Sequence, residues 1–378
     1  MQPLYEVAGV LNAHWPQVQQ SVQLNSWQLR TLHAVRRCRT AALGAHVDGC
    51  TSCGHLRISY NSCRNRHCPK CQGNEREKWI QAREQELLPV PYFHVVFTLP
   101  DTLNALCLYK PAVMYNLLFQ TAWSVLNSFG NDDKWLGAQS GMIAILHTWG
   151  QSLSLHPHLH CIVPGGGLNK QGKWKTAKAN GKYLFSVKAM SKVFRGRFIA
   201  ALRQQLPQQM TPQLVKQLYK TAWVVFAKRP FGGPQNVIEY LGRYTHKIAI
   251  SNHRIKNIVQ GKITFSYKDY RHMAATKEMT LDVLEFIRRF ALHILPKGFV
   301  RIRHYGILSS TSKAACTVII KEQLPAIKSE PNPKQEMYNP LQCPCCKKET
   351  MQTILRFNRR GPPQGWEEMA KSILDCVV

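Results

Sequence analysis

Three histidines occupy alternate positions in the segment 156–160, which reads HPHLH. The apolar residues that follow predict a β-strand, and side chains two apart on a strand point to the same face. His158 and His160 therefore place two imidazoles side by side, and His156 is a third candidate, although Pro157 interrupts the strand before it. Imidazole nitrogens bind divalent ions, so the pair predicts half of an open metal site. The alternative is that His158 and His160 are ordinary polar residues on the solvent-exposed face of an edge strand.

Two tyrosines, Tyr240 and Tyr244, lie four residues apart in the segment 234–246, which has a helical pattern. Residues with this spacing share a helix face, so both hydroxyls project together. A metal-binding histidine pair together with one or two tyrosines is a known means of cutting single-stranded DNA. The metal polarises the phosphate, and a tyrosine phenolate attacks that phosphate to form a covalent phosphotyrosine. Arg243 and Lys247 lie beside the tyrosines and are predicted to contact phosphate, with solvated charges on an exposed helix face as the alternative.

Two C-x2-C pairs, separated by 14 residues, predict a structural zinc site. This spacing is close to that of a four-thiolate zinc site, and the metal then stabilises a small domain that has little core of its own. Chance pairing of cysteines is the alternative. The predicted zinc ligands are Cys50, Cys53, Cys68 and Cys71.

The same stretch holds two spare ligands, Cys63 and His67, which could replace a cysteine or build a second site. This stretch is also basic. A basic segment that zinc stabilises most often binds a nucleic acid, so Arg64 and Arg66 are predicted to contact DNA. Surface solvation of these charges is the alternative.

The chain contains 13 cysteines, an odd number that clusters in knuckles rather than in a disulfide framework, which indicates zinc in a reducing compartment. Cys343, Cys345 and Cys346 form a further knuckle that lacks a clear second pair, since Cys376 lies too near the end of the sequence. This half-site is interpreted either as one that a partner completes or as a vestige.

The composition favours a polyanion as the binding partner. The sequence has 378 residues, 44% of them hydrophobic, which is enough for two or three packed domains. Its 50 Lys and Arg against 21 Asp and Glu give a net charge of +29, which indicates nucleic acid first and anionic membrane second. There is no apolar run of about 18 residues and no basic-then-apolar leader, so we expect a soluble, cytoplasmic, nucleoid-associated protein without membrane contact.

Hydrophobic periodicity predicts the elements that position these residues. The expected strands are 92–100, 142–149, the histidine strand 156–163 (hairpin-paired with 142–149), 223–227, and a hairpin of 248–250 with 263–265 around Gln260-Gly261. The expected helices are in 1–36, 74–87, 101–128 with a break near Pro111, 187–206, 234–246 and 279–293. The order strand, helix, strand, strand places a metal on a rigid sheet and a nucleophile on a later helix.

The sequence predicts a division of the chain into four segments. Residues 1–37 are N-terminal helices, 38–88 a zinc-binding and DNA-binding domain of the four-cysteine type, and 89–310 the catalytic domain. Residues 311–378 are a polar, linker-like tail with a cysteine knuckle.

Several motifs carry a family resemblance. FTLP at 97–100, HLH at 158–160 and the two tyrosines at 240 and 244 resemble, in order, the motifs of HUH single-strand nucleases. Four longer stretches resemble the rolling-circle transposases of insertion-sequence family 91: NSCRNRHCPKCQ, HPHLHCIVPGGGL, YLGRYTHKIAIS and LPKGFVRIRHYG. The resemblance covers about residues 40–310.

The resemblance implies an α+β fold, an HUH-nuclease-like antiparallel sheet with packed helices preceded by a small zinc-binding domain. It also implies Mg²⁺ or Mn²⁺ on His158 and His160, with Tyr240 and Tyr244 as nucleophiles, and structural Zn²⁺ on the cysteines. One tyrosine would cleave single-stranded DNA at an element end, leaving a 5′-phosphotyrosine and a free 3′ hydroxyl, and the second would act on the target or another strand. No GxxxxGK[ST] motif is present, so unwinding would come from a host helicase.

Three other functions compete with a transposase. A rolling-circle replication initiator uses the same chemistry. A non-catalytic, zinc-dependent DNA-binding regulator explains the charge and the cysteines but not the histidines and tyrosines. A metallohydrolase with three histidines on zinc and water as nucleophile needs neither the paired tyrosines nor the charge.

Overall fold

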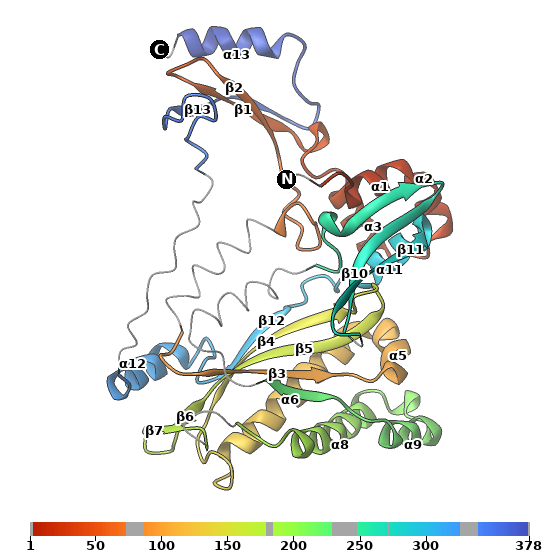
Figure 1. Ribbon diagram of the computed structural model, residues 1–378, viewed down its shortest axis with the longest axis vertical. Helices are drawn as coiled ribbons and strands as arrows, with labels where there is room; N and C mark the ends of the chain where they lie inside the picture. Colours follow the sequence, from red (N-terminus) through yellow and green to blue (C-terminus); the bar gives the residue numbers. More distant parts are fainter. Residues whose placement is uncertain are drawn as a thin grey trace.

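A five-stranded antiparallel sheet dominates the centre of the computed structural model, which describes residues 3–72, 87–178, 184–228, 248–270, 272–325 and 339–376 (Figure 1). Its strand order is β12-β4-β5-β3-β8. The strands are β3 (Tyr92–Thr98), β4 (Gly141–Trp149), β5 (Leu155–Pro164), β8 (Val225–Lys228) and β12 (Ile302–Gly306). The expected α+β class and the predicted pairing of the histidine strand with its predecessor are both confirmed.

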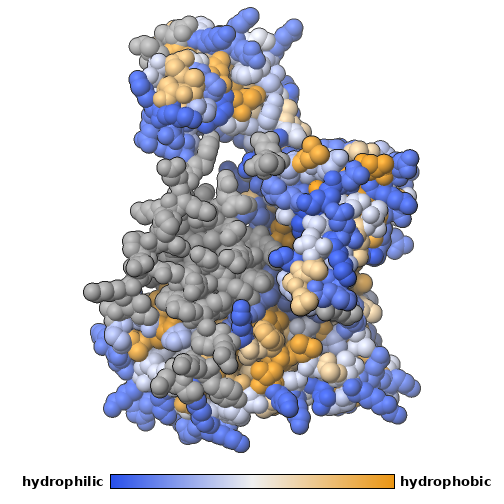
Figure 2. Space-filling view, viewed as in Figure 1, coloured by the Kyte–Doolittle hydropathy of each residue, from blue (hydrophilic) through white to orange (hydrophobic). Residues whose placement is uncertain are grey.

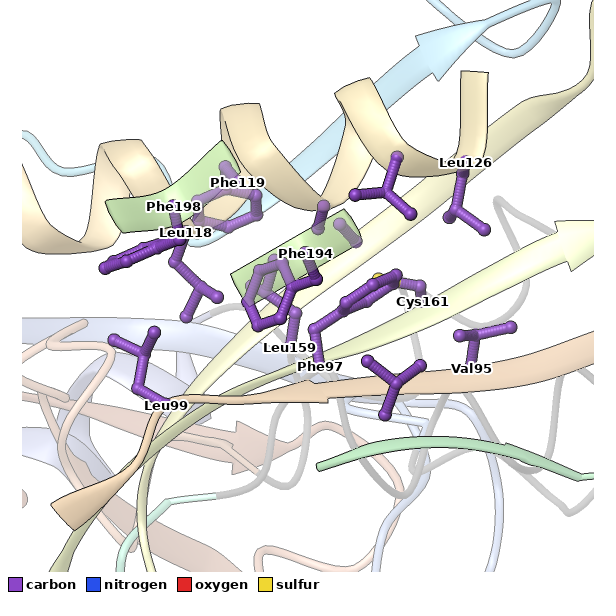
Figure 3. Close-up of a cluster of buried hydrophobic side chains, with 14 of the residues drawn as sticks. Val95, Phe97, Leu99, Leu118, Phe119, Leu126, Leu159, Cys161, Phe194 and Phe198 are labelled. Carbon is purple, nitrogen blue, oxygen red and sulfur yellow. The ribbon is translucent and has the colours of Figure 1, made fainter. Parts of the chain in front are cut away.

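Helices cover one face of this sheet and bury its largest apolar cluster. Alternate residues of the strands, such as Phe97, Leu159 and Cys161, point toward α6 and α8, as Figure 3 shows. A helix break falls before Pro111, as expected, because proline fits the first turn of a helix but not its interior. The helices on this side are α5 (Asn104–Tyr109), α6 (Pro111–Asn131), α8 (Val187–Gln205) and α9 (Pro212–Lys220).

The opposite face of the sheet divides into an apolar half and a polar half. Ile143, Ile145 and Ile162 pack with Ile320 of α12 (Lys313–Gln323). The polar half carries histidines of β3, β4 and β5. A short hairpin of β6 (Gly166–Leu168) and β7 (Trp174–Thr176) follows β5.

A second sheet packs against the N-terminal helices. It consists of β9 (Ile255–Val259), β10 (Lys262–Asp269) and β11 (Ala275–Asp282), and α11 (Val283–Leu292) follows it. Its apolar residues share one core with α1 (Val7–Ala13), α2 (Trp15–Ser21) and α3 (Ser26–Arg36). The indole N–H of Trp27 donates to the Leu295 carbonyl at 3.0 Å, which ties the two parts together. Helices of seven to eleven residues cannot bury their apolar stripes alone, so the 1–37 segment does not stand apart from the chain that follows 248.

The turn at Gln260-Gly261 forms as predicted, with positive φ at both residues, but one partner strand was wrong. Residues 255–259, not 248–250, pair with β10. Two-residue hairpin loops join adjacent strands, so the strand that precedes Gln260 must be the partner.

A third sheet joins segments from the N-terminal and C-terminal parts of the chain. β13 (Met351–Phe357) pairs with β1 (Ala45–Cys50), which pairs with β2 (Leu56–Tyr60). α13 (Trp366–Asp375) packs on β1 and β13, above the rest of the molecule in Figure 1. This corrects the expected polar tail over 311–378, because α12 packs on the central sheet and β13 belongs to the sheet of the zinc-binding segment.

No helix in the described part of the chain is both long and apolar enough to cross a membrane. Hydrophilic side chains, shown in blue in Figure 2, line the outer edges of the described surface in that view. The predicted helix over 234–246 and the predicted helix over 74–87, except its last residue, lie outside the described residues.

His293, at the end of α11, connects the second sheet to the β4–β5 turn and provides a test of this packing. Its Nε2 donates to the Leu153 carbonyl at 3.1 Å, and its Nδ1 lies 3.2 Å from the Thr148 hydroxyl. Burial lowers the pKa of His293 from 6.5 to about 4. The folded state therefore favours the neutral ring, and the stabilisation that results is complete above pH 6.5 and is lost as the pH falls toward 4.

We expect the free energy of unfolding to fall by about 2 kcal/mol between pH 7 and pH 5 through His293 alone. In His293→Gln, whose amide can still donate to Leu153, this part of the pH dependence disappears. Urea denaturation at both pH values measures the difference, and an unchanged pH dependence in the variant would contradict this role.

Candidate functional site

Three histidines from two neighbouring strands converge on the polar half of the sheet. In the β4–β5 register His147 lies directly opposite His158, and His160 follows two positions later on the same face. One nitrogen from each ring lies within 4.8 Å of the other two. The register shifts between His147 and Trp149, as at a β-bulge, and such shifts often redirect a side chain. The structure therefore adds His147 to the predicted histidine pair.

The ring nitrogens are oriented for one common ligand. Nδ1 of His158 donates to the carbonyl of His156 at 2.7 Å, so this ring carries its proton on Nδ1 and its lone pair on Nε2. This Nε2 lies 3.1 Å from Nε2 of His160. Two nitrogens bound to one ion at a right angle, with bonds of about 2.1 Å, are about 3.0 Å apart. The donor set and its spacing thus fit a divalent ion.

His94 of β3 orients His160 from behind. Its Nε2 lies 2.9 Å from Nδ1 of His160, and the two rings are stacked. The tautomer of His160 that offers Nε2 to a metal carries its proton on Nδ1 and donates it to His94, as second-shell partners of metal ligands do. Burial lowers the pKa of His94 to about 3, with smaller effects of Lys228 and His158, so its ring stays neutral and can accept. His94 was not among the predicted site residues. The signal that could have indicated it is a polar histidine within the largely apolar strand 92–100.

The other predicted residues divide into one that lies outside this cluster and four that the structure does not describe. His156 packs beside His158, but its Nδ1 lies 3.9 Å from Asp101 and it is not one of the three clustered histidines. Four predicted residues lie outside the described residues: Tyr240, Arg243, Tyr244 and Lys247.

The cysteines form two separate clusters rather than the single predicted site. In the first cluster the Sγ atoms lie within 4.8 Å of one another, and Cys71 is 3.5 Å from Cys38 and 3.6 Å from Cys63. Its four members are Cys38, Cys63, Cys68 and Cys71.

The thiols of this first cluster cannot all ionise on their own. Hydrogen bonds from Cys38, Cys63 and Cys68 lower the pKa of Cys71, whereas proximity to Cys38 and the others raises that of Cys68. Four adjacent thiolates require a cation, and tetrahedral thiolate coordination is typical of structural zinc.

Cys50 and Cys53 instead lie with Cys343 and Cys346, again with all Sγ atoms within 4.8 Å. The β1–β2 hairpin explains the correction. Cys50 and Cys53 lie at its closed end, while the chain leaves its open end toward Cys63. The five residue pairs of the hairpin separate the two ends by about 17 Å. The 14-residue spacing between the C-x2-C pairs therefore does not place them at one site.

The remaining residues of this stretch have different surroundings. His67 is buried, and burial lowers its pKa, but it belongs to neither cysteine cluster. The guanidinium of Arg66 donates to the carbonyls of Pro296 and Phe299, so this side chain connects the cysteine-rich segment to the segment that follows α11. Arg64 is exposed, with φ of +51°.

Comparison with known proteins identifies the chain. A family model described as "Transposase zinc-binding domain", from insertion-sequence family 91, matches residues 10–99, and one described as "Putative transposase" matches 141–315. A protein of Sinorhizobium fredii named "Putative transposase y4qJ" is 42% identical over 377 residues, 92% of this chain and 94% of the relative. The chain belongs to the transposases of insertion-sequence family 91.

A second relative of the transposase is the "Transposase for insertion sequence element IS801" of Pseudomonas savastanoi pv. phaseolicola. It is 29% identical over 350 residues, 86% of this chain and 81% of the relative. No solved structure matches. The transposase therefore acts on DNA in transposition, with DNA cleavage and strand transfer as its general activity, and its zinc-binding domain and cysteine clusters support structural Zn²⁺.

The first cysteine cluster predicts the zinc content of a variant. Cys38→Ser, which removes one thiolate, should lower the zinc content by one ion per chain, and the exposed Cys376→Ser should leave it unchanged. Metal analysis of the purified transposase measures this. Full zinc content in Cys38→Ser would favour the single site of Cys50, Cys53, Cys68 and Cys71.

His94 should control metal affinity without binding the metal. In His94→Phe the ring remains but the acceptor for His160 is lost, and we expect Mn²⁺ to bind about 10- to 100-fold more weakly. His147→Ala should weaken binding further, while the exposed His272→Gln should not change it. Calorimetric titration measures the affinities, and a wild-type affinity in His94→Phe would contradict the positioning role.

Proposed function

We propose that the transposase nicks and rejoins single-stranded DNA at the ends of its element by HUH-type chemistry, with a tyrosine as nucleophile. The observation that carries this proposal is the convergence of His147, His158 and His160 on one face of an antiparallel sheet. A rigid sheet is a suitable support for such a site, because ligands on strands are held more tightly than ligands on loops.

The three imidazoles would hold Mg²⁺ or Mn²⁺. When bound, the ion would supply Lewis-acid polarisation of the scissile phosphate and stabilise the charge that develops on it. Mg²⁺ prefers oxygen ligands, so an all-nitrogen donor set favours Mn²⁺. His94 accepts a hydrogen bond from the Nδ1–H of His160. This bond keeps Nε2 of His160 directed at the metal position.

Tyr240 and Tyr244 are the proposed nucleophiles. The phenolate oxygen of one tyrosine attacks phosphorus, the bond to the 3′ oxygen breaks, and the departing oxygen takes a proton to become a free 3′ hydroxyl. The product is a 5′-phosphotyrosine that retains the energy of the phosphodiester, so rejoining by a 3′ hydroxyl needs no ATP. The second tyrosine cleaves or accepts a second strand, which allows rolling-circle transposition.

DNA is held by basic residues outside the histidine cluster. The net charge of +29 favours phosphate binding, and the exposed Arg64, beside the first cysteine cluster, is one proposed contact. Arg243 and Lys247, next to the tyrosines in sequence, are two more. The zinc on the first cluster would fix this basic segment, and a host helicase would supply the single strand.

Labelled oligonucleotides test the proposal. Single-stranded DNA from the element ends, labelled at its 3′ end, is incubated with the transposase and Mn²⁺ and analysed on denaturing gels. We expect a labelled band at the mass of the protein, because the 5′-phosphotyrosine carries the 3′ part of the strand. Tyr240→Phe with Tyr244→Phe should abolish this band, and His158→Ala should reduce it at least about 100-fold.

Tyr109→Phe, at an exposed tyrosine of α5, is the matched control and should form the adduct normally. Cleavage without any adduct would identify water as the nucleophile and a metallohydrolase. Adducts in the double tyrosine variant would overturn the nucleophile assignment, and DNA binding with neither cleavage nor adduct would favour a regulator.

A further inference from the structure

The two cysteine knuckles of the second cluster are built alike. In the first, the N–H of Gly54 donates to the Cys50 carbonyl at 3.0 Å, and Gly54 has φ of +70°. In the second, the N–H of Lys347 donates to the Cys343 carbonyl at 3.0 Å, and Lys347 has φ of +63°. A lysine in this left-handed conformation is disfavoured. The chain nevertheless adopts in the second knuckle the turn that glycine permits in the first.

The two knuckles face each other with their sulfurs pointing inward. Cys50 Sγ lies 3.6 Å from Cys346 Sγ, and Cys53 Sγ lies 3.6 Å from Cys343 Sγ. Zinc–sulfur bonds of about 2.3 Å in a tetrahedron place the sulfurs about 3.8 Å apart, whereas a disulfide requires about 2.05 Å. The spacing thus fits four ligands around one ion better than two bonded pairs.

Neighbouring contacts hold the knuckles in this arrangement. The Thr51 N–H donates to the Thr350 carbonyl at 3.1 Å, and the Thr350 hydroxyl lies 3.0 Å from Cys50 Sγ. Arg57 joins Asp48 of β1 to the Pro340 carbonyl, with distances of 3.0 Å and 2.9 Å. Strand β13 continues from the second knuckle and pairs with β1 over its length.

Apolar packing around the sulfurs is sparse. Cys50, Cys343 and Met351 are the buried members of this cluster, with Cys346 partly buried beside them. Such a small cluster stabilises a junction between distant segments only weakly, and a metal ion would supply the missing free energy.

We propose that Cys50, Cys53, Cys343 and Cys346 bind a second structural zinc ion, distinct from the one at Cys38, Cys63, Cys68 and Cys71. On binding, the four thiols release their protons and the thiolates coordinate Zn²⁺. The ion joins segments almost 300 residues apart and completes a three-stranded zinc ribbon of β1, β2 and β13. Residues 339–376 are then part of the zinc-binding domain, although the matched family model ends at residue 99.

Metal stoichiometry of the full-length transposase tests this proposal. The wild type should contain two zinc ions per chain, and Cys343→Ser with Cys346→Ser should contain one. Cys345→Ser is the matched control, because Cys345 lies within the same knuckle but is exposed and outside the cluster, and it should retain both ions. Cys38→Ser should lose the other ion and keep this one.

A more conservative substitution tests the same site if the double serine variant does not fold. Cys346→His keeps a ligand at the same position, so the Co²⁺-loaded protein should still bind two ions per chain. Its visible absorption should change as one of four sulfur ligands becomes nitrogen. Mass spectrometry after thiol blocking should find no disulfide among the four cysteines.

Four results would overturn the second site. Three of them are a single zinc ion per wild-type chain, two ions in the double serine variant, and a Co²⁺ spectrum that Cys346→His leaves unchanged. The fourth is a pair of disulfides, between Cys50 and Cys346 and between Cys53 and Cys343, which would show a covalent link in place of a metal site.

Discussion

The antiparallel register of β4 and β5 determines what the rest of this transposase can do. It places His147 opposite His158, and the two-residue period of the strand adds His160 to the same face. A shift of one residue would turn these imidazoles toward the helices and expose their apolar neighbours. The cluster packed against α6 and α8, which includes Leu146 and Leu159, therefore fixes the position of the histidines.

The polar half of the sheet carries histidines rather than apolar side chains. Elsewhere on that face, isoleucines are covered by α12. Beside these isoleucines, the imidazoles hydrogen-bond to one another and to the backbone, and His94 supports His160. A strand interior thus supplies both the rigidity and the hydrogen-bond partners that a metal site needs.

Local patterns predicted much of this structure, and contacts between distant segments account for what they missed. The helix 187–206, the break at Pro111 and the pairing of the histidine strand depend on neighbours in sequence. His147 could be placed only through a hairpin register, and Cys38 has no adjacent cysteine to mark it. Cys343 finds its partners almost 300 residues away, so no spacing rule assigns it, and the 14-residue spacing of two knuckles suggested a single site that the β1–β2 hairpin separates.

The most direct test of metal binding at the histidines is anomalous diffraction at the manganese edge from crystals of the transposase grown with Mn²⁺. We expect one strong peak within bonding distance of Nε2 of both His158 and His160 and of a ring nitrogen of His147. A peak elsewhere, or none at these histidines under conditions in which the protein cleaves DNA, would contradict the assignment of this cluster as the metal site.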